Sequence, residues 1–144
     1  MTTLAEARNA IAGYERRFRR EDVDRLEVSG LYALFPSSPS TEEVLGRWPD
    51  QWPNGERAGA YLIFDEQLAL LYVGKASKIG ARLSGWFGYD ENKCCRVRHP
   101  GWSRPPRFVL TVAVPEEMRF EAPALEAYLI RALTPPDNTA GLEL

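Results

Sequence analysis

The stretch GAYLIFDEQLALLYVGK, residues 59–75, decides the fold of this chain. It holds two apolar runs, residues 60–64 and 68–73, that a short polar segment separates. Two apolar runs joined in this way are typical of a β-hairpin with a short loop. Tyr61 and Tyr72 then lie on paired strands, and side chains on the same face of paired strands come close together. The pattern therefore predicts that the two tyrosines point into one site.

Helix and strand patterns continue beyond the hairpin. Ser77 is expected to cap a helix over residues 78–86. Residues 107–114 alternate as a third strand, and a proline opens a last helix over residues 123–133. This order predicts an α+β fold, a small antiparallel three-stranded β-sheet flanked by helices.

The first 57 residues are predicted to form an extension packed on residues 58–144. Thr3 and Glu6 make a capping box at the start of a helix that reaches about Arg20. This helix has an apolar stripe, which is expected to lie in the core or in an interface. The stripe consists of Leu4, Ala7, Ile11, Tyr14 and Phe18.

Three further features are expected within the extension. Residues 31–35 form a short apolar run that a proline stops, as in an edge strand. Ser40 and Glu43 make a second capping box, which predicts a short helix to about Trp48. Residues 49–56 are dense in turn-forming residues and separate the extension from the rest of the chain.

The composition indicates a packed globular protein. Apolar residues make up 44% of the chain and aromatic residues 11%. No apolar run approaches the ~20 residues of a membrane span, and charges throughout residues 1–20 argue against a secretory signal. Cys94 and Cys95 are neighbours, which gives no disulfide framework and favours the cytoplasm. With His99 they suggest zinc, but structural zinc usually has four ligands at spaced positions.

Positive charge is concentrated in residues 72–107. The chain has a net charge of −2, whereas this segment holds eight basic and two acidic residues, a net charge of +6. A basic face on an acidic body attracts polyanions, so nucleic acid is the expected partner; an ordinary solvated loop is the alternative. Aromatic residues among the basic ones can stack bases, or else complete the core. The residues predicted to contact nucleic acid are Lys78, Trp86, Lys93, Arg96, Arg98, Arg104 and Arg107.

Glu126 and Arg82 are the charged residues most suited to phosphodiester chemistry. On a helix, the neighbours of Glu126 at three and four positions are apolar. A carboxylate there is costly unless it is paired or binds a metal, and one carboxylate with water and phosphate suits Mg²⁺. Pairing with Arg131 or another arginine is the alternative. The Arg82 guanidinium can bind two phosphate oxygens at once, whether for catalysis or for positioning alone.

The two short motifs of the hairpin, with the polar residues after them, resemble the GIY-YIG nuclease family. The residues that carry the resemblance are Gly59-Ala60-Tyr61, Tyr72-Val73-Gly74, Lys75, Arg82, Glu126 and Asn138. The chain is most similar to the nuclease domain at the N-terminus of UvrC, where a lysine directly follows the second motif. Ala60 and Val73 replace isoleucine. Trp86 stands where many homing endonucleases of the family carry a histidine, which also favours the UvrC-like type.

The resemblance implies an endonuclease that hydrolyses phosphodiester bonds, with DNA as the expected substrate and Mg²⁺ or Mn²⁺ as the cofactor. Tyr61 would act as the general base or relay the proton, and Tyr72 would orient the attacking water. Lys75 is the cation expected to favour the phenolate. Arg82 would steady the phosphate, and Glu126 would hold the metal.

The resemblance covers residues 59–138, so residues 58–144 would form the nuclease domain. Asn138, at the end of the matched segment, would bond substrate phosphate or hold the site together. A turn-forming asparagine after Pro135-Pro136-Asp137 explains this residue equally well.

Two functions of other classes stay open beside the endonuclease. One is a nucleic-acid-binding module with the nuclease fold and no useful turnover. The other is a protein-interaction domain, in which the stripe of the N-terminal helix binds a protein partner or a second copy of the chain.

Overall fold

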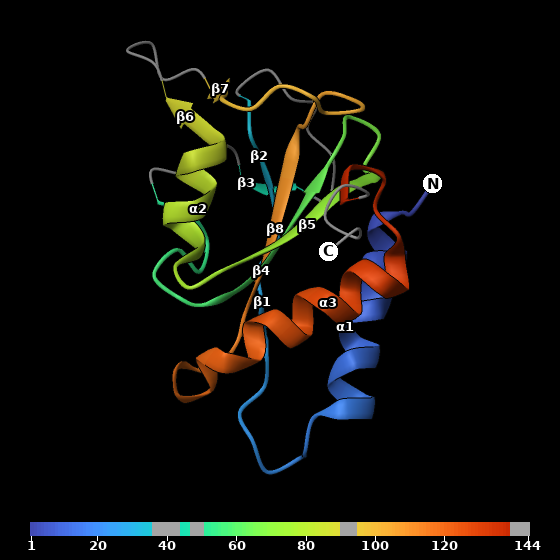
Figure 1. The fold of residues 1–144 in the computed structure, drawn as a ribbon, viewed down its shortest axis with the longest axis vertical. Coiled ribbons are helices and arrows are strands. Elements are labelled where there is room, and N and C mark those ends of the chain that lie inside the picture. The colour runs from blue at the N-terminus through green and yellow to red at the C-terminus, as the bar shows by residue number, and fades with distance from the viewer. Residues whose placement is uncertain (36–43, 47–50, 90–94, 139–144) are drawn as a thin grey trace.

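The computed structural model describes residues 1–35, 44–46, 51–89 and 95–138. The fold is α+β, with helices α1 and α3 on one side of a sheet and helix α2 on the other (Figure 1). The helices are α1 (Leu4–Phe18), α2 (Ile79–Trp86), α3 (Ala122–Leu133) and the short 3-10 helix η1 (Glu116–Glu121). In this part of the chain no helix has the length and apolar character to cross a membrane.

The main sheet has six strands among the described residues. They are β1 (Glu27–Val28), β2 (Leu31–Ala33), β3 (Val44–Gly46), β4 (Gly59–Phe64), β5 (Leu70–Ala76) and β8 (Phe108–Ala113). Their order is β3-β2-β8-β4-β5, and β1 also pairs with β8. All pairs are antiparallel except β2 with β3. β5 is therefore an edge strand in the described part of the sheet.

The predicted hairpin and third strand are confirmed as β4, β5 and β8. β4 and β8 are buried at every residue, because helices cover both faces of the sheet. A near-continuous apolar run is the sequence that such a strand requires. The sheet is larger than the three strands predicted, since β1, β2 and β3 extend it beyond β8.

Two predictions in the N-terminal part are wrong. β2 is not an edge strand, because it pairs with β3 on one side and with β8 on the other. Residues 44–46 form strand β3, where a helix to Trp48 was expected. Ser40, Glu43 and Trp48 themselves lie outside the described residues. A local capping pattern does not fix a helix when a neighbouring strand offers main-chain pairing.

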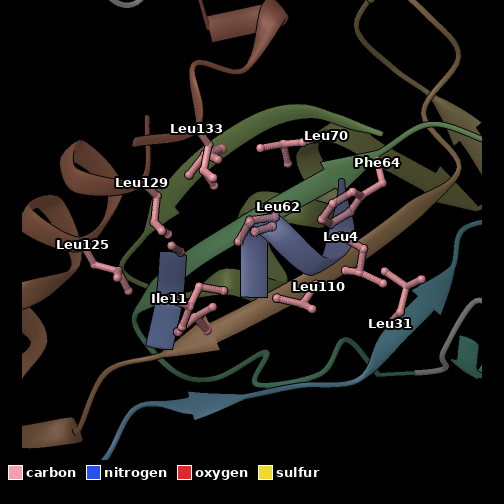
Figure 2. Close-up of a cluster of buried hydrophobic side chains, with 14 of the residues drawn as sticks. Leu4, Ile11, Leu31, Leu62, Phe64, Leu70, Leu110, Leu125, Leu129 and Leu133 are labelled. Atoms are coloured by element: carbon pink, nitrogen blue, oxygen red, sulfur yellow. The ribbon is translucent and has the colours of Figure 1, made fainter. Parts of the chain in front are cut away.

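Helix α1 begins with the predicted capping box. The Thr3 hydroxyl accepts from the backbone N–H of Glu6, and the Glu6 carboxylate accepts from that of Thr3. The predicted stripe is buried from Leu4 to Tyr14, whereas Phe18, at the end of the helix, is 64% exposed. Figure 2 shows Leu4 and Ile11 of α1 in one apolar cluster with leucines of β4, β8 and α3. The N-terminal helix thus belongs to the same core as the hairpin.

A buried charge network ties the end of α1 to the start of α3. The Arg19 guanidinium donates two hydrogen bonds to the Glu121 carboxylate, at 2.8 and 3.2 Å. It also donates to Glu15 and to the carbonyl of Asp24, both at 2.7 Å. The Tyr14 hydroxyl donates to Glu121 at 2.8 Å. Glu15 and Arg19 are an i,i+4 pair, but no pattern in the sequence predicts Glu121 as their partner, because it lies about a hundred residues further along the chain.

Helix α2 covers the other face of the sheet. Ile79 and Leu83 of α2 are buried against Ile63 and Val109, in a second apolar cluster. The predicted Ser77 cap is wrong: Lys78 occupies the N-cap position, and no side chain caps the helix. The loop expected after α2 contains a small hairpin, β6 (Phe87–Tyr89) with β7 (Cys95–Val97).

Candidate active site

The two tyrosines of the hairpin lie side by side on the face of the sheet that α2 covers. In the β4–β5 register, Tyr61 pairs with Gly74 and Ile63 pairs with Tyr72, so the tyrosines are diagonal neighbours. Their ring centroids are 6.2 Å apart. The Tyr61 ring crosses directly over Gly74, where any Cβ atom would collide with it. The glycine of the second motif therefore makes room for the tyrosine of the first.

The glycine of the first motif has a different steric reason. A Cβ atom at Gly59 would collide with the backbone carbonyl of Val112 on β8. Only glycine lets the two strands approach this closely at the end of the ladder. Both motif glycines are therefore explained by close packing around the hairpin.

Trp86, at the end of α2, joins the tyrosine pair. Its indole Nε1–H donates a hydrogen bond of 2.8 Å to the Tyr61 hydroxyl oxygen. Its ring also packs against Tyr72, with centroids 5.4 Å apart, and against Trp102 at 5.3 Å. Trp86 was predicted to contact nucleic acid, but its indole N–H is directed at a tyrosine of the site.

Burial dominates the acid–base behaviour of the tyrosines. Tyr61 is only 2% exposed, and burial raises its pKa above the ordinary value of 10.0. The hydrogen bond from Trp86 and the charge of Arg82 lower that pKa, without offsetting the burial. The pKa of Tyr72 is also raised, by burial and by Glu126, while Arg82 and a hydrogen bond with Tyr61 lower it. Both hydroxyls are therefore protonated at neutral pH.

Lys75 does not supply the positive charge that acts on the tyrosines. Side chains alternate along a strand, so Lys75 lies on the face opposite to Tyr72 and Gly74. Its ammonium instead lies 3.8 Å from the Glu126 carboxylate. Arg82 is the cation that lowers the pKa of both tyrosines. The cation that acts on the tyrosines is thus Arg82, where Lys75 was expected.

Glu126 reaches the edge of β5 from helix α3. Its side chain is 20% exposed, and its ion-pair partner is Lys75 rather than Arg131. Burial raises the pKa of the Glu126 carboxyl above the ordinary value of 4.5, although Lys75 and Arg82 lower it. The carboxylate interacts electrostatically with Tyr61 and Tyr72 as well. A partly buried carboxylate thus lies next to Lys75, on the face of β5 opposite to the tyrosines, and its charge acts on both tyrosines and on Arg82.

Asn138 clamps the free edge of β5. Its side-chain oxygen accepts from the backbone N–H of Val73 at 2.8 Å, and its amide donates to the Val73 carbonyl at 2.9 Å. Asn138 is only 5% exposed. These side-chain bonds fit the predicted role of holding the site, and the backbone N–H of Asn138 also donates to the Pro135 carbonyl at 3.2 Å, as the turn-forming alternative requires.

Arg82 opens onto a pocket of about 440 Å³, which we call the cationic pocket. Lys78 and Arg119 line it together with Arg82 and small residues. Arg119 comes from η1 and donates to the carbonyl of Ser77 at 2.9 Å. Sequence reasoning missed Arg119, because it lies in a mostly acidic segment and only the tertiary fold brings it to α2.

The remaining predicted nucleic-acid contacts that the structure describes interact with different parts of the protein. Arg104 donates to the buried carboxylate of Asp65 at 2.6 Å, and Arg107 lies over the ring of Phe35 at 4.5 Å. The side chain of Arg98 covers Gly88 in the small hairpin. Arg96 is exposed on β7, and Lys93 lies outside the described residues. Of the predicted residues that the structure describes, Lys78 lines a pocket with Arg82, and Trp86 contacts both tyrosines.

Few of the described side chains near the tyrosines could bind one of the metal ions that the sequence suggests. Among the described residues, no group of three or more His, Cys, Asp or Glu side chains is placed to hold a metal ion. Glu126 would therefore be the single carboxylate ligand in this region. One carboxylate, completed by water and phosphate oxygens, fits Mg²⁺ or Mn²⁺. The zinc alternative depends on Cys94, which lies outside the described residues.

Comparison with known proteins adds no family to this description. No protein-family model matches the chain, and no curated protein sequence matches it.

Proposed function

We propose that the protein is a metal-dependent endonuclease that hydrolyses phosphodiester bonds, with DNA as the expected substrate. The mutual electrostatic influence of Tyr61, Tyr72, Arg82 and Glu126 carries the proposal. These residues come from β4, β5, α2 and α3, and each interacts electrostatically with the others. The three strands β8-β4-β5, with α2 and α3 on their two faces, would correspond to the GIY-YIG fold.

The tyrosines would act as a proton relay. Raised pKa values make a standing phenolate unfavourable, so a tyrosine that passes a proton fits better than one that waits deprotonated. Tyr72, the less buried of the two, would orient the attacking water. Tyr61, whose oxygen Trp86 supports by hydrogen bonding, would accept a proton through Tyr72 and release its own hydroxyl proton to solvent, so that no phenolate persists.

The cations and the carboxylate would complete the site. Arg82 would hold the non-bridging oxygens of the phosphate, whose negative charge grows during the attack. Glu126 would hold the metal ion, and Lys75 would balance the charge of Glu126 before substrate arrives. When bound, a divalent ion supplies Lewis-acid stabilisation of the leaving oxygen.

A nicking assay tests the proposal. Supercoiled plasmid is incubated with wild type and with Glu126→Ala in Mg²⁺, in Mn²⁺ and in EDTA. We expect metal-dependent nicking by the wild type and a loss of at least about a hundred-fold in the variant. Glu117→Ala, which removes an exposed glutamate of η1, is the matched control and should nick as the wild type does. Equal nicking by wild type and Glu126→Ala would refute the assigned role of Glu126.

The binding module without turnover is the second candidate, and one observation favours it. Tyr61 is buried and its oxygen is already bonded to Trp86, as in a site that is not in use. In that case the wild type binds plasmid but does not nick it with either metal. Trp86→Phe, which frees the Tyr61 oxygen, would then still fail to nick.

A further inference from the structure

We propose that a small aromatic pocket beside the tyrosines receives an unpaired nucleobase, with guanine preferred. The proposal rests on the proposed function, since it names the kind of nucleic acid that the same site would take. The pocket has a volume of about 120 Å³. It is lined by Tyr72, Trp86, Pro100, Gly101, Trp102 and Asp137.

The walls of the pocket are suited to stacking. Trp102 lies edge-on to Tyr72 at 5.9 Å and tilted against Trp86 at 5.3 Å, so three aromatic rings meet there. Gly101, which lines the pocket, has a φ of +98°, a conformation that glycine adopts readily. Every base has a π-face that can stack on such rings, but a base inside a duplex cannot leave its neighbours without cost. The pocket therefore favours a base that is already unpaired.

The polar groups of the pocket favour guanine. The Asp137 carboxylate only accepts hydrogen bonds, and its present partner, the backbone N–H of Ser103, lies at 3.2 and 3.3 Å. The indole Nε1 of Trp102 is a buried donor without a partner among the described residues. Guanine presents two adjacent N–H donors next to a carbonyl acceptor on one edge. That edge complements a carboxylate and an indole N–H together.

The position of the pocket relates the base to the phosphate. Tyr72 belongs both to this pocket and to the tyrosine pair. Arg82, which acts on the same tyrosines, opens onto the cationic pocket instead. A nucleotide whose base enters the aromatic pocket would therefore leave its phosphate near Tyr72 and Arg82. An unpaired guanosine next to the cleaved bond is the substrate feature that this arrangement predicts.

Binding to labelled single strands tests the proposal without relying on cleavage. The probes are ten-nucleotide oligothymidylates, either unmodified or with one central guanine, adenine or cytosine, measured by fluorescence anisotropy in EDTA. A duplex of the guanine strand is the fifth probe. We expect the guanine strand to bind about ten-fold more tightly than the all-thymidine strand and more tightly than the duplex.

Three variants of pocket residues test whether the guanine preference arises in this pocket. Trp102→Ala should reduce binding of the guanine strand to the level of the all-thymidine strand, whereas Trp102→Phe should retain part of the stacking. Asp137→Asn should remove the preference for guanine without weakening binding of the all-thymidine strand. Phe18→Ala, an exposed aromatic residue on α1, is the control and should change nothing. Thermal unfolding of each variant checks that it is folded.

The outcomes separate this proposal from the endonuclease. Equal binding of all single strands, or an unchanged guanine preference in folded Trp102→Ala and Asp137→Asn, would overturn the pocket even if the plasmid is nicked. A guanine preference that both variants remove would support the pocket even if no nicking occurs. Failure to bind any strand, together with no nicking, would overturn both proposals.

Discussion

Glu121 and Glu126 lie five positions apart at the start of one helical segment, yet their surroundings are opposite. Glu121 accepts three hydrogen bonds from Arg19 and Tyr14, and its side chain is 8% exposed. Among the described residues, Glu126 has one ion-pair contact, at 3.8 Å, with a lysine whose own side chain is 50% exposed. A carboxylate with its bonding capacity filled holds elements together. A carboxylate with capacity left over can take a further ligand.

The largest effect expected from this comparison concerns Glu121. Glu121→Ala would leave the Arg19 guanidinium buried without its main partner, and should lower the free energy of unfolding by about 3–5 kcal/mol. Urea denaturation measures the change. Glu117→Ala, in the same helical segment but exposed, should alter the free energy by no more than about 0.5 kcal/mol. A loss of less than about 1 kcal/mol for Glu121→Ala would mean that the network is not structural.

An intermediate effect is expected for Asn138, which resembles Glu121 in having its polar atoms paired. Asn138→Ala should destabilise the protein by about 1–3 kcal/mol, because the N–H and C=O of Val73 lose their partners. Hydrogen exchange should show faster exchange of the Val73 amide than in the wild type. If Asn138 served only to bind substrate, stability and exchange would both stay as they are.

The smallest effect on stability is expected for Glu126. Glu126→Gln should change the free energy of unfolding by less than about 1 kcal/mol, since a half-exposed ion pair contributes little. The same variant should abolish metal-dependent nicking if the proposed function is right. If Glu126→Gln nicks poorly and its free energy of unfolding is also lower by several kcal/mol, Glu126 has a structural role like that of Glu121.

The pH dependence of stability sharpens the comparison further. Because burial raises the native pKa of Glu126, the folded protein binds the Glu126 proton more tightly than the unfolded chain does. Glu126 thus favours the fold at low pH, and this contribution is lost as pH rises from near 4.5 through the raised native pKa. In EDTA, wild type should therefore lose stability relative to Glu126→Gln over that window. If the free energies of unfolding of the two proteins change with pH in parallel, the raised pKa of Glu126 is contradicted.

Local sequence patterns predicted the parts of the fold that local physics determines. The capping box at Thr3, the hairpin of β4 and β5, and the proline that opens α3 follow from neighbouring residues, and each is found. The position of β2 inside the sheet was not predictable in this way. It depends on pairing with β8, about eighty residues further along the chain.

In the candidate site, too, local sequence patterns predicted some features, whereas others depend on distant parts of the chain. Tyr61 and Tyr72 were predicted to be neighbours from strand pairing, and their rings do pack together. The face on which Lys75 lies also follows from the alternation of side chains along the strand. Its nearness to Tyr72 in the sequence suggested the tyrosines as its partners, but it pairs with Glu126. Arg119 reaches the cationic pocket only through the path of η1, so no local pattern could have placed it there.

The clamp of Asn138 on Val73 bears on how molecules of this protein behave toward one another. An edge strand with free main-chain groups is a template on which a strand of another molecule can pair, which leads to aggregation. β5 is seven residues long, and Asn138 occupies both main-chain groups of its central residue. The Thr2 carbonyl, which accepts from the backbone N–H of Leu70 at 2.8 Å, occupies the start of the same edge, so the two contacts together hinder pairing with a second molecule at the edge of the proposed site.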